Sequence, residues 1–206
     1  MSGTRQRLVD AGTRVLAEQG VESASLIEVA RRAGQRNRGA VHYHFGSREG
    51  LVVAVLEQYA DFLAEREGEL LRQGQEAEGL PPVVEAVVRP AVEVAETGWR
   101  GRCYLVVVAE LAESHQGSID PAVAATLART GGYEVYQELA RRMPDLDDDV
   151  RRERLALMTG FVLHSVADRA RAVERGNGRA QLGTDAFTAN LVAMAAAMLG
   201  APTLDA

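Results

Sequence analysis

A run of three polar side chains, Arg36-Asn37-Arg38, stands between two short segments of apolar pattern near the start of the chain. An arginine can pair with O6 and N7 of guanine through two donors, and an asparagine can pair with N6 and N7 of adenine. Gly39 follows directly, and because it has no side chain, a DNA groove or a phosphate can approach the backbone there. These residue types in this order predict contact with DNA bases.

Two short helices are predicted on either side of this run. Ser25 and Glu28 have the spacing of a capping box, so the first helix begins at Ser25, and it ends at Gly34. Asn37 is the predicted N-cap of the second helix. Val41, His44 and Phe45 share one helical face and are expected to point inward, which leaves Arg38, His42 and Tyr43 on the outer face. Two such helices with a tight polar break are typical of a helix-turn-helix.

The charge of the chain is unevenly distributed. Residues 1–50 contain eight arginines and five acidic residues, a net charge of +3, whereas residues 51–206 contain fifteen arginines and twenty-four acidic residues, a net charge of −9. This asymmetry predicts a basic head that meets a polyanion and an acidic body that stays away from it. A merely solvated face is the alternative interpretation of the four arginines at positions 31, 32, 36 and 38.

The whole sequence predicts an all-α fold, because aromatic residues make up only 5% and alanine, leucine, arginine and glutamate are abundant. We expect an N-terminal three-helix helix-turn-helix domain at residues 1–50, a connecting fourth helix at 51–74 and a larger helical ligand-binding and dimerisation domain at 75–206. Residues 104–108 alone would also suit a strand. About nine helices are expected, at residues 4–19, 25–33, 38–45, 48–73, 81–96, 102–113, 120–143, 147–175 and 184–199.

The sequence gives little support for metal binding, catalysis or membrane association. His42 and His44 lie on different helix faces, and no cysteine or carboxylate completes a metal site, so neither a metal nor a cofactor is expected. We predict no enzyme, because there is no nucleophile elbow and no Gly-rich phosphate loop. The single cysteine and the lack of a signal peptide or a membrane-length apolar tract favour a cytoplasmic protein with no membrane partner.

Aromatic and polar side chains among the apolar residues of the body are candidates for a small-molecule pocket. Plain core packing is the alternative interpretation for each of them. The candidate residues are Phe62, Trp99, Cys103, Tyr104, Tyr133, Tyr136, Phe161 and His164.

Residues 26–51 resemble the signature of the TetR family of bacterial regulators, and the resemblance extends over about the first 60 residues. Two features depart from the family pattern. The break after Gly34 is one residue longer than usual, and His42 stands where the family usually has a tyrosine. The matching elements are Ile27, Val29-Ala30, Ala33-Gly34, Gly39-x-Val41 and His44-Phe45-Gly46-Ser47-Arg48-Glu49-Gly50-Leu51.

The resemblance implies roles for the residues of the head. Ser25, His44 and Arg48 would hold DNA phosphates, and His42 would take the phosphate position of the missing tyrosine. The bases would be approached by Arg36, Asn37, Arg38 and Tyr43.

The resemblance also implies a ligand-responsive repressor that binds a palindromic operator as a homodimer, with half-sites roughly 34 Å apart. The last two helices, at residues 147–175 and 184–199, carry wide apolar and small-residue faces suited to a four-helix interface between two copies. A ligand of unknown identity would shift the fourth helix, with Phe62 and Leu63 as transmitting contacts. The alternative function is a helical adaptor that binds another protein and no specific DNA.

Overall fold

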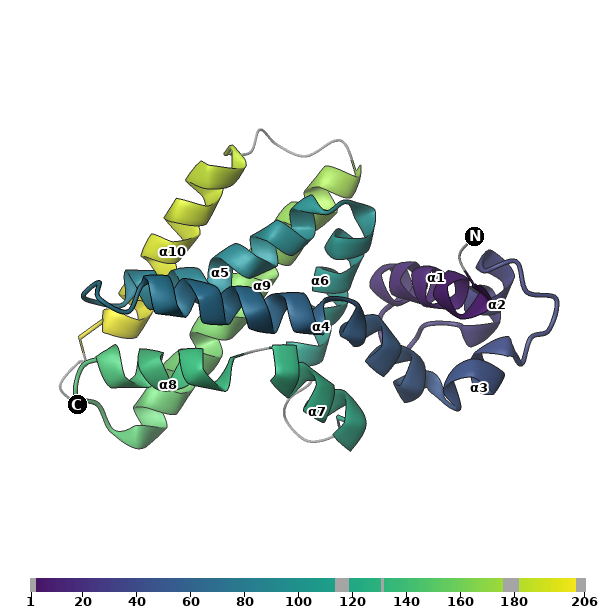
Figure 1. Ribbon diagram of the computed structural model, residues 1–206, viewed down its shortest axis with the longest axis horizontal. Helices are drawn as coiled ribbons and strands as arrows, with labels where there is room; N and C mark the ends of the chain where they lie inside the picture. The colour runs from purple at the N-terminus through teal and green to yellow at the C-terminus, as the bar shows by residue number, and fades with distance from the viewer. Residues whose placement is uncertain (1–2, 114–118, 131, 176–181, 203–206) are drawn as a thin grey trace.

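The computed structural model describes residues 3–113, 119–130, 132–175 and 182–202, and it confirms the all-α class. These residues form ten helices (Figure 1). The helices are α1 (Thr4–Gln19), α2 (Leu26–Arg32), α3 (Ala40–Phe45), α4 (Arg48–Gln73), α5 (Pro81–Glu96), α6 (Trp99–Glu113), α7 (Pro121–Thr130), α8 (Tyr133–Arg142), α9 (Asp148–Arg175) and α10 (Thr184–Gly200).

Helices α1 to α3 form a small head at one end of the molecule (Figure 1). The inner face of α1 is apolar, and its residues Leu8, Val15 and Leu16 are fully buried against α2 and α4. The two short helices have little apolar surface of their own, and each contributes two buried residues to this core. The head is therefore held together by α1 and the first turns of α4, which leaves the outer sides of α2 and α3 exposed.

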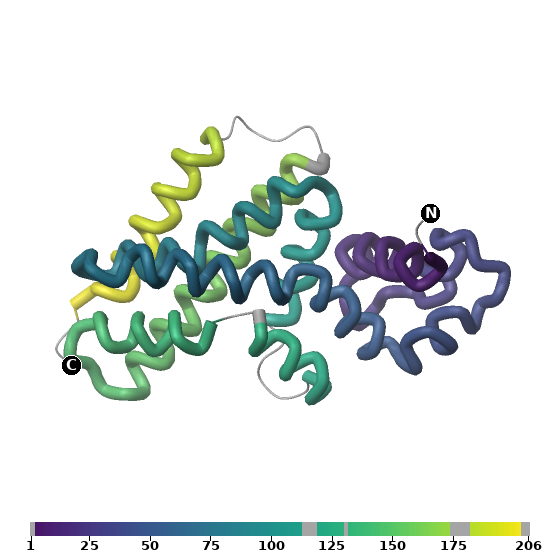
Figure 2. Tube along the Cα trace, in the orientation of Figure 1, coloured from purple at the N-terminus to yellow at the C-terminus, as the bar shows by residue number. Residues whose placement is uncertain are grey.

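The 26-residue helix α4 runs from the head into the body (Figure 2), where α5, α6, α7 and α8 contact it. It lies against α5 and α7, while α6 packs on α9 and α10 packs on α5 and α9. One continuous apolar core joins the head and the body through α4 and α6. Helix α4 therefore contributes buried residues to the head and to the body.

The expected single helix at residues 120–143 is wrong, because the chain forms α7 and α8 with a break at Gly132. Glycine is a poor helix former, and here the backbone has an alternative partner. The Gly132 N–H donates to the buried Glu67 carboxylate, with an N–Oε2 distance of 2.6 Å, instead of to a preceding helical carbonyl. By contrast, residues 104–108 are helical and belong to α6. None of the helices described here is long and apolar enough to cross a membrane.

Candidate nucleic-acid interface

The turn after α2 is a regular helix end followed by an inserted loop. Gly34 has a φ of +71°, a left-handed conformation in which glycine is favoured, and its N–H donates to the Arg31 carbonyl. The Gln35 N–H donates to the Ala30 carbonyl at 2.9 Å. These two bonds form a Schellman motif, which ends α2 sharply. The longer break noted in the sequence therefore lies after Gln35, at residues 36–39.

Helix α3 begins later than predicted, because Asn37 forms a turn of its own. Its Oδ1 accepts the Gly39 N–H at 2.9 Å, and its carbonyl accepts the Ala40 N–H at 3.1 Å. The expected N-cap at Asn37 is thus wrong, and Gly39 is the residue that precedes the helix. Oδ1 of Asn37 is thus bonded to the loop backbone, while its second lone pair and the Nδ2 donors can still engage a base.

The outer side of this loop and of α3 carries exposed side chains. Arg36 and Arg38 are exposed, and among the residues that the structure describes neither forms an ion pair. On α3, His42 is exposed and Tyr43 has 84% of its surface exposed. Val41 faces the core, as predicted. The loop and the helix together present two unpaired cations and an aromatic hydroxyl on one side of the head.

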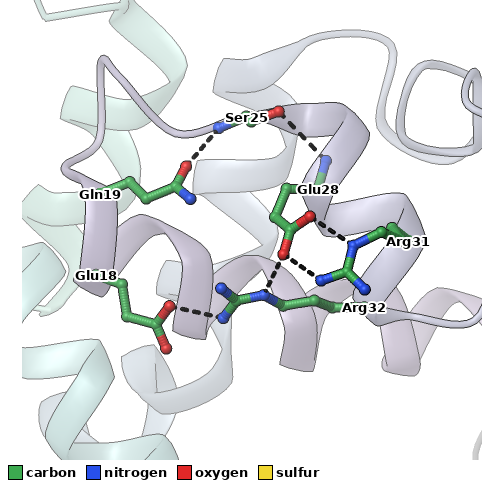
Figure 3. Close-up of polar contacts among 6 residues, drawn as sticks. All are labelled: Glu18, Gln19, Ser25, Glu28, Arg31 and Arg32. Carbon is green, nitrogen blue, oxygen red and sulfur yellow. Dashed lines mark hydrogen bonds and ion pairs between the residues drawn. The ribbon is translucent and has the colours of Figure 1, made fainter.

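The arginines of α2 have a different environment (Figure 3). The Glu28 carboxylate accepts from both Arg31 and Arg32, at 2.6 and 2.7 Å, and Arg32 also pairs with Glu18 of α1 at 2.6 Å. The bonds from Arg31 and then Arg32 hold the pKa of the Glu28 carboxyl at about 2. The four arginines at 31, 32, 36 and 38 are therefore two distinct pairs, and only the second pair carries uncompensated charge.

The capping box predicted at the start of α2 is only half formed. The Ser25 Oγ accepts the Glu28 N–H at 3.3 Å, as expected. The Glu28 side chain does not return to the Ser25 N–H, which donates instead to Oε1 of Gln19 at 3.0 Å. The two arginines one turn away compete successfully for the carboxylate, because each forms a charge-assisted bond with it.

The remaining residues predicted to hold phosphates lie at the edges of this face. Ser25 is exposed at the first turn of α2. His44 is half-buried between the rings of Tyr43 and Phe45. Arg48 begins α4, but its Nη1 donates to the carbonyls of the α1–α2 loop at residues 21 and 24, at 3.1 and 2.7 Å. Arg48 therefore fixes the loop that leads into α2, a role that sequence reasoning missed.

The head is also fastened to the body through α6. The guanidinium of Arg100 makes two bonds to Asp10 of α1, at 2.7 and 2.9 Å, and these bonds lower the pKa of the Asp10 carboxyl. Further along α6, Glu110 accepts the Val21 N–H at 2.7 Å. The orientation of the head thus depends on two body helices, α4 and α6.

The residues predicted to line a ligand pocket are spread over the body. Phe62 and Tyr133 have 41% and 74% of their surface exposed. Tyr104 is fully buried, with its ring 4.9 Å from that of Tyr59. Tyr136 is half-buried on α8, and its hydroxyl lies 2.7 Å from Oγ1 of Thr159 on α9.

The other four predicted residues lie on α6 and α9. Cys103 lines a cleft of about 550 Å³ between α1, α6 and α9. Trp99 lines a separate cleft of about 370 Å³ beside α1 and α2. Phe161 and His164 are half-buried on α9, and the Nδ1 of His164 is bonded to the Gly160 carbonyl at 2.7 Å. The structure therefore does not gather the eight predicted residues around one cavity.

Glu67 is a buried carboxyl group in the body that sequence reasoning missed. It has 7% of its surface exposed, and burial raises the pKa of its carboxyl to about 7, against the opposing effect of the Gly132 N–H. The signal was hidden, because Glu67 belongs to the charged run 65–69, which has the composition of a solvated helix face. Its spacing of four residues from Leu63 and three from Leu70 places it on their apolar face.

Two sequence profiles match this chain in order. Residues 8–55 match bacterial regulatory proteins of the tetR family, and residues 85–198 match a tetracyclin repressor-like C-terminal domain. The chain belongs to the TetR family of bacterial regulators. The second match alone spans more than half of the chain, and it lies in the body, where the sequence itself gave only a loose resemblance.

Individual regulators match this chain over a short stretch. The regulator SrpR of Pseudomonas putida is 47% identical over 53 residues, which are 26% of this chain and 24% of SrpR. The regulator AcrR of Shigella flexneri is 41% identical over 54 residues, 26% of this chain and 25% of AcrR. The chain therefore matches about a quarter of the length of these relatives.

Solved structures resemble the whole chain in fold. The ketosteroid transcriptional regulator KstR2 of Mycobacterium tuberculosis has a TM-score of 0.61 and 16% identity, and the match covers 98% of this chain and 97% of KstR2. AibR, solved in complex with isovaleryl coenzyme A and operator DNA, has a TM-score of 0.57 and 15% identity, with 93% and 97% covered. At such identities the likeness establishes the shared fold.

Proposed function

We propose that this TetR-family chain is a DNA-binding transcriptional regulator, a ligand-responsive repressor that binds a palindromic operator as a homodimer in the cytoplasm. One observation carries the proposal: in the described part of the chain, Arg36 and Arg38 stand exposed and without an ion pair in the loop that leads into α3, a short helix whose residues Ala40 and Val41 are buried in the head. A short recognition helix of this kind can enter the major groove of DNA, which is wide enough for an α-helix. We propose no enzymatic activity and no cofactor.

The residue roles follow from the geometry of the face. Arg36 and Arg38 approach base edges, with Tyr43 beside them and Gly39 allowing close approach of the backbone. Asn37 shapes the loop and offers Nδ2. The phosphates are held by Ser25, His42 and His44, while Arg48 contributes through the loop that it fixes. Phosphate contacts set the register on DNA, and base contacts set the sequence preference.

Dimerisation is proposed through α9 and α10. Helix α10 is apolar on both sides: Leu191, Ala195 and Leu199 are buried, whereas Met194 is 47% exposed. On α9, Leu157 is 56% exposed. A helix that is apolar all round requires a second surface to cover it, and a second copy of the same pair of helices forms a four-helix interface. Two heads on one dimer then match two half-sites of a palindrome.

Effector control is proposed to act through α4. The crystal structure of AibR contains both isovaleryl coenzyme A and operator DNA, which supports a fold that serves ligand and DNA together. In this chain, a ligand must bind more tightly to the dimer whose heads do not fit the operator. A coupling of about 1–3 kcal/mol changes operator affinity by roughly 5- to 150-fold. The assigned parts are residues 1–50 for DNA, 51–74 as the connection and 75–206 for ligand and dimerisation.

The test is a titration of the full-length protein against palindromic DNA from the region upstream of its own gene and against a scrambled duplex. We expect retardation that depends on the sequence and weakens steeply with salt, because arginine–phosphate contacts release counterions. The competing function is a helical adaptor whose arginine face binds an acidic protein. Equal, weak binding to both duplexes would contradict the regulator and favour the adaptor.

A further inference from the structure

We propose, on the basis of the ligand-responsive function above, that Glu67 recognises the effector and that the effector is an apolar molecule with a protonated amine. Neither the family nor the relatives assign a ligand to this chain.

The Glu67 carboxyl is buried with too few partners. Its Oε2 accepts a single hydrogen bond, from the Gly132 N–H at 2.6 Å. Among the residues that the structure describes, its Oε1 accepts none, and no arginine or histidine forms an ion pair with Glu67. Burial of a carboxylate without a cation is costly unless a partner arrives. A cationic ligand is such a partner.

The polar groups next to Glu67 are acceptors as well. The Thr159 hydroxyl donates to the Leu155 carbonyl at 2.7 Å, so its oxygen is left to accept from the Tyr136 hydroxyl. The Tyr136 hydroxyl donates its proton to Thr159, and its oxygen can still accept a hydrogen bond. Tyr136 lies one helical turn after Gly132, the partner of Glu67, and its N–H donates to the Gly132 carbonyl at 3.1 Å. Burial raises the pKa of Tyr136, the bond with Thr159 opposes this rise, and the Glu67 charge adds to it. An ammonium group has three donors and no acceptor, and it complements such surroundings.

The rest of the neighbourhood is apolar. Leu63 and Leu70 are buried one turn before and after Glu67 on α4. Val135 of α8 is buried and lies beside Gly132, the partner of Glu67. These side chains favour an apolar skeleton around the ammonium group, since a small hydrophilic cation would gain little from leaving water.

Glu67 is also placed to convey binding to the head. It lies on α4, and its partner Gly132 lies at the break between α7 and α8. Gly132 has a φ of −52°, which any residue can adopt, but a Cβ there would lie 2.7 Å from the Glu67 Oε2. Glycine therefore permits the close contact that joins α4 to this break. A ligand that competes for the carboxylate loosens this contact and frees α4 to shift.

The experiment uses three matched sets of compounds on hexyl, cyclohexylmethyl and 2-phenylethyl skeletons, each as the amine, the alcohol and the carboxylate. Thermal unfolding and operator binding are measured at pH 7.5 for the full-length wild type, Glu67→Gln and Glu65→Gln. Gln keeps an acceptor for the Gly132 N–H but cannot pair with an ammonium group. Glu65 is exposed on the same helix and serves as the matched control.

We expect at least one amine to raise the unfolding midpoint of the wild type and of Glu65→Gln by about 5 °C and to weaken operator binding. The matching alcohol and carboxylate, and the same amine with Glu67→Gln, should have less than a fifth of this effect. The assignment is overturned if no amine acts, if alcohols or carboxylates act equally, or if Glu67→Gln responds like the wild type. If the ligand-free wild type does not bind its operator, the proposed regulator is overturned instead. The assignment of Glu67 would then still be supported by an amine-selective rise of the unfolding midpoint.

Discussion

The head and the body each contain charged groups without an ion-pair partner among the described residues, but those of the head are in water and that of the body is in the protein interior. Arg36 and Arg38 of the head are exposed, so water solvates them at almost no cost to folding. Glu67 of the body is buried, where an unpaired carboxylate is expensive. An exposed cation therefore indicates function only through the structure around it, whereas a buried lone carboxyl marks a candidate functional site.

The largest expected effect tests the cost of burying Glu67. In the unfolded chain its carboxyl titrates near 4.5, and in the folded protein near 7. Folding therefore favours the protonated form, and the contribution to stability is complete below pH 4.5 and is lost as the pH rises through 7. The loss amounts to about 3 kcal/mol in the free energy of unfolding.

Chemical unfolding of the wild type and Glu67→Gln between pH 4.5 and 8, at one fixed protein concentration, measures this effect. The difference in stability between the two proteins should change by about 3 kcal/mol in favour of Gln as the pH rises. Glu65→Gln should follow the wild type across the range. A difference between wild type and Glu67→Gln that is independent of pH would show that the Glu67 carboxyl is solvated.

The next effect tests the exposed cations of the head. Arg38→Ala should cost about 1–3 kcal/mol on the operator, a roughly 5- to 150-fold loss of affinity, and clearly less on a scrambled duplex. The reason is that a bidentate guanine contact exists only at the correct base. Arg141→Ala removes an exposed arginine of the body and should change neither affinity. An equal loss on both duplexes for Arg38→Ala would remove its base-reading role.

Arg48→Ala should reduce binding to operator and scrambled DNA by the same factor. This side chain donates to the carbonyls of Val21 and Ala24, so its loss should also lower the stability of the protein by about 1–2 kcal/mol. Fluorescence anisotropy and urea unfolding of one preparation provide both numbers. Unchanged stability together with weaker DNA binding would instead assign Arg48 to a direct phosphate contact.

The smallest effect concerns the paired arginines of α2. Glu28→Gln removes the carboxylate that Arg31 and Arg32 share, so both become available to phosphates. Binding to operator and scrambled DNA should tighten together, and the slope of log K against log salt should become steeper by roughly one for each arginine that engages DNA. An unchanged salt slope would show that these two arginines lie beyond reach of the backbone.

The sequence predicted the head more completely than the body, for physical reasons. In the head, the caps and stops are local, so Ser25 and Gly34 could be assigned from their neighbours alone. The late start of α3 was not predicted, because an asparagine can either cap a helix or form a turn with the loop backbone. In the structure the Asn37 side chain accepts a hydrogen bond from Gly39 in the loop.

In the body the decisive contacts are non-local. The break at Gly132 depends on Glu67, which is 65 residues away in the chain. Aromatic residues were therefore chosen as pocket candidates by type, and Tyr133 is largely exposed. Of these candidates, Tyr136 lies one helical turn after Gly132, the partner of the buried carboxyl, and no local pattern distinguished it from the others.

The most direct test of the central claim follows the arginine Nε–H signals of the ¹⁵N-labelled protein by NMR during titration with operator DNA. The signals of Arg36 and Arg38 should shift with the operator and much less with a scrambled duplex, while those of Arg31 and Arg32 keep their positions beside Glu28. If the Arg36 and Arg38 signals do not shift when operator DNA is added, DNA recognition by this face of the head is contradicted. This holds whether or not the Arg31 and Arg32 signals shift.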